Sequence, residues 1–341
     1  MAQPRGREPE PEHEPLRLGD ALRPIVLGRG ASPSAPGIEL RRPELSLGVA
    51  PDGYLLGYAL IDQTRPPPLG GLTSAPGQSL DAAQTLMTSA SLQLALYGVR
   101  RPAHHCVLLV DPDDTPTAVY ARLALFVDAL RPLLDADLCR LVYVRDEQRV
   151  SPPLALRSLV ATSGGATLSA LEHAGIRVRG ATLALHQAGE PARLLADQLV
   201  RRGMHLVADG DGALRAGADV LLVDGPVWRL DPRRAATLRA RVIVALGPLL
   251  GSDSVEARLA ERSILVVPDT LAATGLLLGS HLLGEGYGED AAIGRCFTLA
   301  RALTADVLAR AAGQSVPVFA RSLAREALRA RDEAAAARPG R

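Results

Sequence analysis

The second half of this chain alternates short apolar segments with segments of helical periodicity, and this alternation constrains the fold more than any other feature. Apolar strands separated by helices predict a parallel, doubly wound sheet, because right-handed crossovers place the helices on both of its faces. The expected strands are residues 182–186, 205–209, 219–224, 241–246 and 264–269, and the expected helices between them are residues 191–202, 233–240 and 255–262.

The first half also alternates strands with helices, but less regularly. Ser79 precedes a stretch of helical periodicity and is expected to cap its first turn, and Ser163 is expected to cap the helix that leads into the second half. A proline-rich loop is expected at residues 65–71. The expected strands are residues 45–50, 55–62, 106–111 and 141–144, the expected helices are residues 79–96 and 115–134, and three long helices are expected to close the chain at residues 270–283, 290–312 and 316–335.

The sequence therefore predicts an α/β protein with an N-terminal α/β domain and a C-terminal, Rossmann-like domain built on a doubly wound parallel sheet. A length of 341 residues suits two such domains. The last helix carries Arg and Glu on one side and Ala and Leu on the other, so it is expected to pack on a domain surface. The expected boundaries are a disordered tail at residues 1–36, domains at residues 37–150 and 151–312, and a closing helix and tail at residues 313–341.

Charge and hydropathy exclude several classes of partner. A net charge of +1 gives no electrostatic case for binding nucleic acid or an anionic membrane. The apolar run at residues 276–283 falls well short of the roughly 20 residues that span a bilayer. Residues 1–36 have no apolar core of the signal-peptide type. The sequence predicts a cytoplasmic protein.

No metal site is expected from the sequence. The chain has three cysteines, Cys106, Cys139 and Cys296, and their odd number and wide spacing argue against a disulfide framework or a thiolate zinc site. His104 and His105 precede Cys106 directly, but neighbouring residues of a strand point to opposite faces of the sheet and do not converge on one ion.

The turn after the first strand of a doubly wound sheet is where a dinucleotide would bind. In the fingerprint Gly-x-Gly-x-x-Gly/Ala, Gln187 stands at the first position, while Gly189 and Ala192 satisfy the other two. Glu190 places a carboxylate at the N-terminus of the next helix, where a diphosphate would bring negative charge of its own. Asp209 ends the second strand and could accept a ribose hydroxyl or could cap the following loop. Bound NAD or NADP is therefore predicted to contact Gly189, Ala192 and Asp209.

Several motifs together resemble a known family. They are Leu69-Gly70-Gly71, Met87-Thr88, Asp111-Pro112, the strand, turn and helix at residues 180–203, and the segment at residues 260–269 that ends in Pro268-Asp269. By their order and spacing, residues 45–335 resemble the glutamate/leucine/phenylalanine/valine dehydrogenases, and leucine dehydrogenase most in size and motif order. The resemblance implies an N-terminal substrate and oligomerisation domain, a C-terminal NAD(P)-binding domain, a cleft for oxidative deamination of an L-amino acid, and a homo-oligomer.

Most of the family's working residues are absent. Its carboxylate-binding lysine follows the Met-Thr pair, where this chain has Ala90, and its second lysine is nearest to His105. The chain contains no lysine at all, and arginine stays charged and cannot serve as a tuned amine base. It contains no asparagine either, and the family's asparagines match positions near Pro248 and Ala273. Only the catalytic aspartate is matched, by Asp146.

Two hypotheses of function follow. In the first, the chain is a catalytically degenerate family member retained as an oligomeric scaffold, a regulatory partner or a small-ligand sensor, because one positioned acid or base contributes roughly 10²- to 10⁴-fold in rate. In the second, it is an active NAD(P)-dependent oxidoreductase acting on an L-amino acid or a related small acid. His105 would then serve as acid and base beside Asp146, with Arg100 or Arg101 binding the substrate carboxylate.

Overall fold

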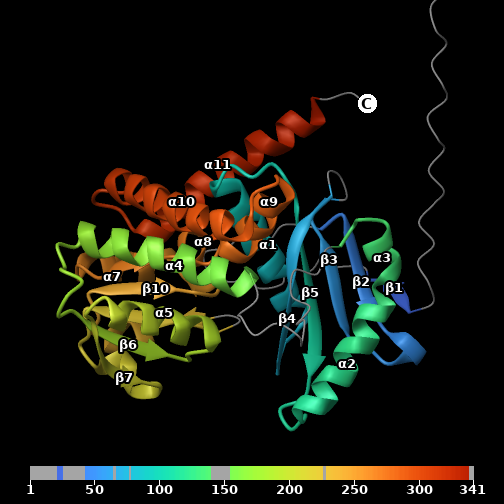
Figure 1. The fold of residues 1–341 in the computed structure, drawn as a ribbon, viewed down its shortest axis with the longest axis horizontal. Coiled ribbons are helices and arrows are strands. Elements are labelled where there is room, and N and C mark those ends of the chain that lie inside the picture. Colours follow the sequence, from blue (N-terminus) through green and yellow to red (C-terminus); the bar gives the residue numbers. More distant parts are fainter. Residues whose placement is uncertain are drawn as a thin grey trace, which may run out of the picture.

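The computed structural model describes residues 21–25, 43–63, 67–76, 78–139, 154–225 and 228–337. These residues form two five-stranded sheets that lie side by side, with helices packed against both (Figure 1). We call β1–β5 with α1–α3 the first domain and β6–β12 with α4–α10 the second domain. The expected strand at residues 141–144 and Asp146 lie outside the described residues.

The first sheet has the strand order β1-β2-β3-β5-β4. β4 pairs with β5 in parallel, whereas the other neighbours are antiparallel. Two of the predicted strands are confirmed as β2 and β3, and β5 begins three residues earlier than predicted. The strands are β1 (Leu22–Pro24), β2 (Leu45–Val49), β3 (Gly57–Ile61), β4 (Leu69–Pro76) and β5 (Ala103–Val110).

Strand β4 shows that the loop predicted at residues 65–71 was wrong from Leu69 onward. Glycine has a low strand propensity, so Gly70 and Gly71 concealed the strand. Their role is steric, because a Cβ at Gly70 would lie 2.1 Å from the carbonyl oxygen of His104. Glycine therefore lets β4 approach β5 closely at this point.

Helices cover both faces of the first sheet. α1 (Leu80–Leu96) packs on the inner face, and Ser79 caps it as predicted by accepting a hydrogen bond from the backbone N–H of Ala82 at 3.2 Å. α2 (Pro116–Ala129) and α3 (Arg131–Asp135) cover the outer face, away from the second sheet (Figure 1). The single helix predicted at residues 115–134 breaks at Leu130, since Pro132 lacks the N–H that would continue it.

The second sheet confirms the doubly wound prediction. Its order is β12-β10-β8-β6-β7, and every neighbouring pair is parallel. The five strands agree with the predicted ones to within a few residues: β6 (Thr182–His186), β7 (His205–Asp209), β8 (Val220–Val223), β10 (Val242–Ala245) and β12 (Leu265–Val267). α4 (Leu154–His173) and α5 (Glu190–Arg201) pack on one face, and α6 (Pro232–Thr237) and α7 (Asp253–Glu261) pack on the other. Two short strands that were not predicted, β9 (Trp228–Leu230) and β11 (Leu249–Gly251), pair with each other.

Ser163 does not cap a helix, so that prediction was wrong. It lies in the middle of α4, is buried, and donates a hydrogen bond to the carbonyl oxygen of Ala272 at 2.7 Å. The glycine pair that follows it suggested a helix start. Instead, Gly165 lets α10 (Glu289–Arg310) approach, since a Cβ there would lie 2.4 Å from the carbonyl oxygen of Phe297.

The closing helices connect the two domains. The helix predicted at residues 270–283 divides into α8 (Asp269–Ala272) and α9 (Gly275–Gly284), while α10 and α11 (Val316–Ala336) are confirmed. α11 packs along α1, as its amphipathic pattern predicted (Figure 1). In the part of the chain that the structure describes, no helix combines the length and apolarity needed to cross a membrane.

Candidate functional site

The strand order places one candidate site at the carboxyl ends of β6 and β8. The chain runs from β6 to β7 on one side and then to β8 on the other side of β6. Ligands of open α/β sheets bind in the crevice at such a switch point, and the order 2-1-3-4-5 is one of the two common ones. The candidate site lies between the turn that joins β6 to α5 and the residues that follow β8.

The turn between β6 and α5 has the shape that the fingerprint requires. Gln187, at the first glycine position, has a left-handed φ of +52°. Such a backbone costs a residue with a Cβ roughly 1–2 kcal/mol. Gly189 is the N-cap of α5, and Ala192 is fully buried against the sheet. The predicted residues therefore lie where a diphosphate-binding turn would place them, although glycine is missing at the strained position.

Asp224, which directly follows β8, occupies the anion position of this turn. Its Oδ2 accepts a hydrogen bond from the backbone N–H of Gly189 at 3.1 Å, and its Oδ1 accepts one from Gly225 at 2.7 Å. Burial raises the pKa of Asp224, against the opposing effect of backbone N–H donors at Gly225, Ala192 and Gly189. A carboxylate of the chain itself thus binds the N–H groups at the start of α5 that would otherwise face a phosphate.

Asp209 lies at the end of β7, as expected for a residue that would bind ribose. Its Oδ2 is 3.0 Å from Nη1 of Arg193 on α5, and both side chains are largely exposed. A 3-10 helix, Asp211–Arg215, follows directly after Gly210. An exposed pair of this kind contributes little to stability and leaves Asp209 accessible.

His105 lies on β5, on the face of the first sheet that α1 covers. Its Nε2 is 3.0 Å from the hydroxyl oxygen of Thr73 on β4. Burial, and then the neighbouring His104, lower the pKa of His105 to about 3, so the imidazole is neutral near pH 7. The second predicted catalytic residue, Asp146, lies outside the described residues, so the structure does not test whether the two side chains meet.

The two arginines proposed as carboxylate clamps precede β5. Arg100 is exposed, whereas Nε of Arg101 donates to the carbonyl oxygen of Pro67 at 2.9 Å. The backbone carbonyl of Arg101 accepts a hydrogen bond from Arg331 of α11 at 3.1 Å. Arg101 therefore contacts the segment just before β4 and the closing helix α11.

Ala90 lies in an apolar environment. It is 6% exposed on α1, within a cluster that includes Leu277, Leu278 and Leu282 of α9. Leu276 of the same helix also approaches closely, since a Cβ at Gly71 would lie 2.9 Å from its Cδ2. Leucines therefore fill the space around the position to which the resemblance assigns a carboxylate-binding lysine.

A buried polar network joins α1 to α8 just beside this cluster. The carboxylate of Asp269 accepts hydrogen bonds from the hydroxyl of Ser89 at 2.5 Å and from Nε2 of Gln93 at 3.2 Å. All three side chains are buried. These bonds fix the first domain against the second domain, so Asp269 of the Pro-Asp motif has a structural role here.

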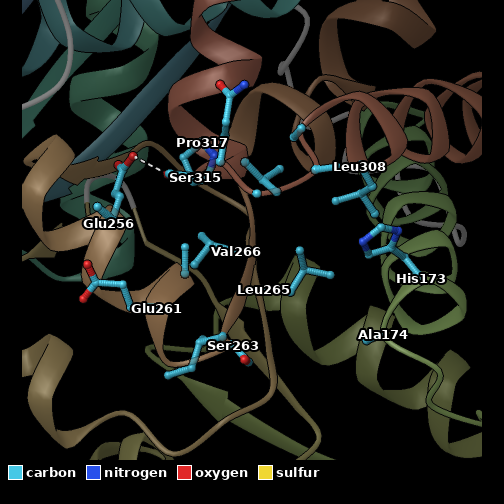
Figure 2. A pocket seen from close by; sticks show the side chains of 18 of the residues that line it. His173, Ala174, Glu256, Glu261, Ser263, Leu265, Val266, Leu308, Ser315 and Pro317 are labelled. Carbon is cyan, nitrogen blue, oxygen red and sulfur yellow. Dashed lines mark hydrogen bonds between the residues drawn. The ribbon is translucent and has the colours of Figure 1, made fainter.

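A pocket of about 690 Å³ opens at the opposite edge of the second sheet. Figure 2 shows Glu256 and Glu261 of α7 on one side of it and His173 on the other, with Leu265 at its base. This edge holds the amino ends of β10 and β12 and is therefore remote from Asp224. The volume is in the range of small-ligand sites, but the pocket is not the dinucleotide crevice.

His104, Cys106 and Cys139 meet inside the first domain, on the outer face of the sheet. The two sulfurs lie 3.6 Å apart, and Cys139 lies 3.9 Å from Nδ1 of His104. The hydrogen bond between the thiols lowers the pKa of Cys139, against the opposing effect of burial, and the same hydrogen bond raises the pKa of Cys106. Although the two cysteines are widely spaced in the sequence, Cys139 folds back on β5 and lies beside Cys106.

Comparisons with solved structures identify the fold. The hetero-hexameric glutamate dehydrogenase of Thermus thermophilus, in its Leu-bound form, superposes with a TM-score of 0.67 at 20% identity, over 88% of this chain and 91% of that one. The L-tryptophan dehydrogenase of Nostoc punctiforme superposes with a TM-score of 0.58 at 17% identity, over 85% and 96%. The glutamate dehydrogenase of Peptoniphilus asaccharolyticus superposes with a TM-score of 0.62 at 13% identity, over 86% and 92%. The chain has the amino acid dehydrogenase fold.

The resemblance inferred from the motifs is thus confirmed at the level of the fold. No protein-family model matches the sequence, and no curated protein matches it. The sequence identities to these solved structures are 20% or below, so the shared fold alone does not establish the chemistry. The chemistry has to be inferred from the residues of the site.

Sequence reasoning about the amino acid dehydrogenase fold missed Asp224 and Cys139. Asp224 follows an apolar strand directly and stands beside a glycine, which is the position that a switch-point residue takes. That signal could have identified it. Cys139 carries no such signal, because only the path of α2 and α3 brings it back to β5.

Proposed function

We propose that this protein does not catalyse oxidative deamination and serves as a non-catalytic subunit of an oligomeric assembly with the amino acid dehydrogenase fold. The observation that carries the proposal is the position of Asp224. Its carboxylate accepts the backbone hydrogen bonds at the start of α5, where the dinucleotide diphosphate of an active enzyme would bind.

The electrostatic consequence is large. Two like charges about 4 Å apart repel by about 4 kcal/mol at an effective dielectric constant of about 20. A dinucleotide would have to displace Asp224 or accept this repulsion, and Glu190 adds a second negative charge in the first turn of α5. The repulsion corresponds to binding about a thousandfold weaker than at an open site.

The substrate side supports the same proposal. A deaminating enzyme must bind an amino acid carboxylate, and Ala90 offers no cation there. The surrounding leucines of α9 make the position apolar, where an unpaired carboxylate would lose its hydration without compensation. Loss of the substrate anchor and obstruction of the cofactor site act together against catalysis.

The assembly is the second part of the proposal. A hetero-hexameric glutamate dehydrogenase shares this fold over most of its length, so the fold is used in assemblies of unlike chains. We extend this to the present chain, which would assemble with copies of itself or with a catalytic relative. A small ligand could then act through the pocket beside Glu256, and leucine is a reasonable first compound to test.

The test combines an activity assay with a binding assay. Purified protein is incubated with several L-amino acids and with NAD or NADP, and reduced cofactor is measured by absorbance, with an Asp146→Ala variant in parallel. NADH and NADPH binding is measured by calorimetry. The proposal expects no turnover and no binding at millimolar cofactor. Turnover that Asp146→Ala abolishes would refute it.

The alternative is an active NAD(P)-dependent oxidoreductase with a rebuilt site. Its support is the fold and the retention of Gly189, Ala192 and Asp209 at positions suited to a dinucleotide. It requires His105 to act with Asp146 and requires Arg100 or Arg101 to bind the substrate. Loss of turnover in both His105→Gln and Asp146→Ala, with cofactor binding unchanged, would establish it.

A further inference from the structure

Three potential metal ligands converge on the outer face of the first sheet. His104 and Cys106 are alternate residues of β5, so their side chains point to the same face. Cys139 follows α3, whose end turns back at Asp137 with a left-handed φ of +57°. The backbone N–H of Cys139 donates to the carbonyl of Leu133 at 3.2 Å, which holds the cysteine against the strand.

We propose that His104, Cys106 and Cys139 bind one zinc ion inside the first domain. For zinc bonds of about 2.3 Å to sulfur and about 2.0 Å to nitrogen, tetrahedral geometry separates two sulfurs by about 3.8 Å and a sulfur from a nitrogen by about 3.6 Å. The observed separations are 3.6 Å between the sulfurs and 3.9 Å between Cys139 and Nδ1 of His104. All three donor atoms lie within 4.8 Å of one another. Zinc could enter once side-chain shifts of up to about 1 Å bring all three donor atoms to these separations.

The charges of the three ligands suit a divalent cation. Two thiolates and a neutral imidazole carry two negative charges, so a complex with Zn²⁺ is neutral overall. Neutrality matters because the three side chains are at most 2% exposed and are surrounded by Phe126, Leu130 and Leu133. A charged group in such surroundings would be strongly disfavoured. Sulfur and imidazole ligands select zinc or other soft metals over magnesium or calcium.

Gly70 of β4 leaves the space that the imidazole occupies. A Cβ at this position would lie 2.5 Å from Nδ1 of His104. The ring is therefore held between the glycine backbone and Cys139. Three protein ligands leave the fourth position of a tetrahedral ion to an added donor such as water, as in zinc sites with a Cys₂His ligand set.

The principal competing outcome is a disulfide between the same cysteines. A disulfide brings the sulfurs to about 2.05 Å. The observed 3.6 Å separation is that of two thiols in contact. Disulfides are also rare in proteins kept under reducing conditions. The experiment distinguishes the two outcomes directly.

The first measurement uses the full-length wild-type chain. It is expressed with added zinc, purified without chelator in the presence of a non-thiol reductant, and analysed for metals by mass spectrometry. About one zinc per chain is expected. Replacing zinc with Co²⁺ should give a sulfur-to-cobalt charge-transfer band and the visible bands of a four-coordinate ion. Zinc content below about a tenth of the chain concentration, with no cobalt band, overturns the proposal.

The second measurement compares cysteine variants. Cys139→Ser is expected to reduce zinc content at least tenfold. Cys296→Ser is the matched control, because Cys296 is equally buried but lies in a separate cluster beside α9 and α10. It should keep its zinc. Zinc retained by Cys139→Ser at the wild-type level, or intact-mass evidence for a Cys106–Cys139 disulfide in the isolated protein, would also overturn the proposal.

Discussion

Replacing Asp224 with alanine should create a dinucleotide site that the wild-type chain lacks. In the wild type, the Asp224 carboxylate accepts the N–H of Gly189 at 3.1 Å, so a bound diphosphate oxygen would lie about 4 Å from a negative charge. The repulsion of about 4 kcal/mol at an effective dielectric constant of about 20 corresponds to about a thousandfold in Kd. We expect Asp224→Ala to bind NADH at least a hundredfold more tightly than the wild type.

Asp224→Ala should also lower the stability of the protein, and this loss can be measured separately from cofactor binding. It removes a carboxylate that caps α5, which typically lowers the free energy of unfolding by about 1 kcal/mol. The matched control is Asp231→Ala, since Asp231 caps α6 by accepting the N–H of Arg234 at 2.8 Å and lies away from the β6 turn. It should show a comparable loss of stability with no gain in affinity.

Calorimetric titration with NADH and with NADPH compares the three proteins at one ionic strength. Thermal unfolding confirms that each is folded. Micromolar binding by the wild type would refute the reasoning, because it would mean that Asp224 does not obstruct the site. Equal affinities of wild type and folded Asp224→Ala would show that another feature, such as the strained Gln187, closes the site.

Further predictions concern packing, ion pairs and pH. Ala90→Arg should lower the free energy of unfolding by at least about 3 kcal/mol in urea titrations, because it buries a charge among leucines. Arg331→Met should lower the free energy of unfolding by about 3–5 kcal/mol, because it leaves the fully buried carboxylate of Asp62, now 3.1 Å from Arg331, without this partner. Arg310→Met breaks an exposed ion pair and should lower it by less than about 1 kcal/mol. Equal costs would contradict the burial argument. Burial alone would raise the pKa of Asp219, but hydrogen bonds and an arginine lower it below the usual 3.8. The stability that Asp219 contributes is therefore present above that value and is lost as pH falls through the lowered pKa, so the difference in unfolding free energy between wild type and Asp219→Asn should shrink in acid.

The second domain could be predicted from sequence because its signal is local. Each buried parallel strand is a short apolar run, and each run is separated from the next by a helix, as for β8 and β10. The first domain was less predictable, because part of its signal is not local. β4 contains Gly70, which the close approach of β5 requires, and Gly71, which faces Leu276 of α9. No local sequence pattern records these approaches.

The candidate sites show the same division. The turn that holds Gly189 and Ala192 and the strand end that holds Asp209 could be predicted because they are local features. The hydrogen bond from Gly189 to Asp224 and the convergence of Cys139 on His104 depend on contacts between segments far apart in the chain. Sequence spacing alone did not reveal this convergence, since the 32 residues between Cys106 and Cys139 contain two helices that return the chain to its starting strand.

The closing helix adds a mechanical argument to the electrostatic one. α11 forms a buried ion pair with each domain, through Arg321 and Glu256 of α7 at 2.6 Å and through Arg331 and Asp62 beside β3 at 3.1 Å. The two arginines are ten residues apart, which is about 15 Å along a helix. Separating β3 from α7 would break at least one pair and leave a buried charge, at a cost of about 3–5 kcal/mol. Many enzymes with a cleft between domains use opening and closure to admit substrate and exclude water. The buried ion pairs thus join α11 to both domains, and the Asp224 carboxylate already binds the N–H group of Gly189 at the start of α5. Both features agree with the proposed non-catalytic role.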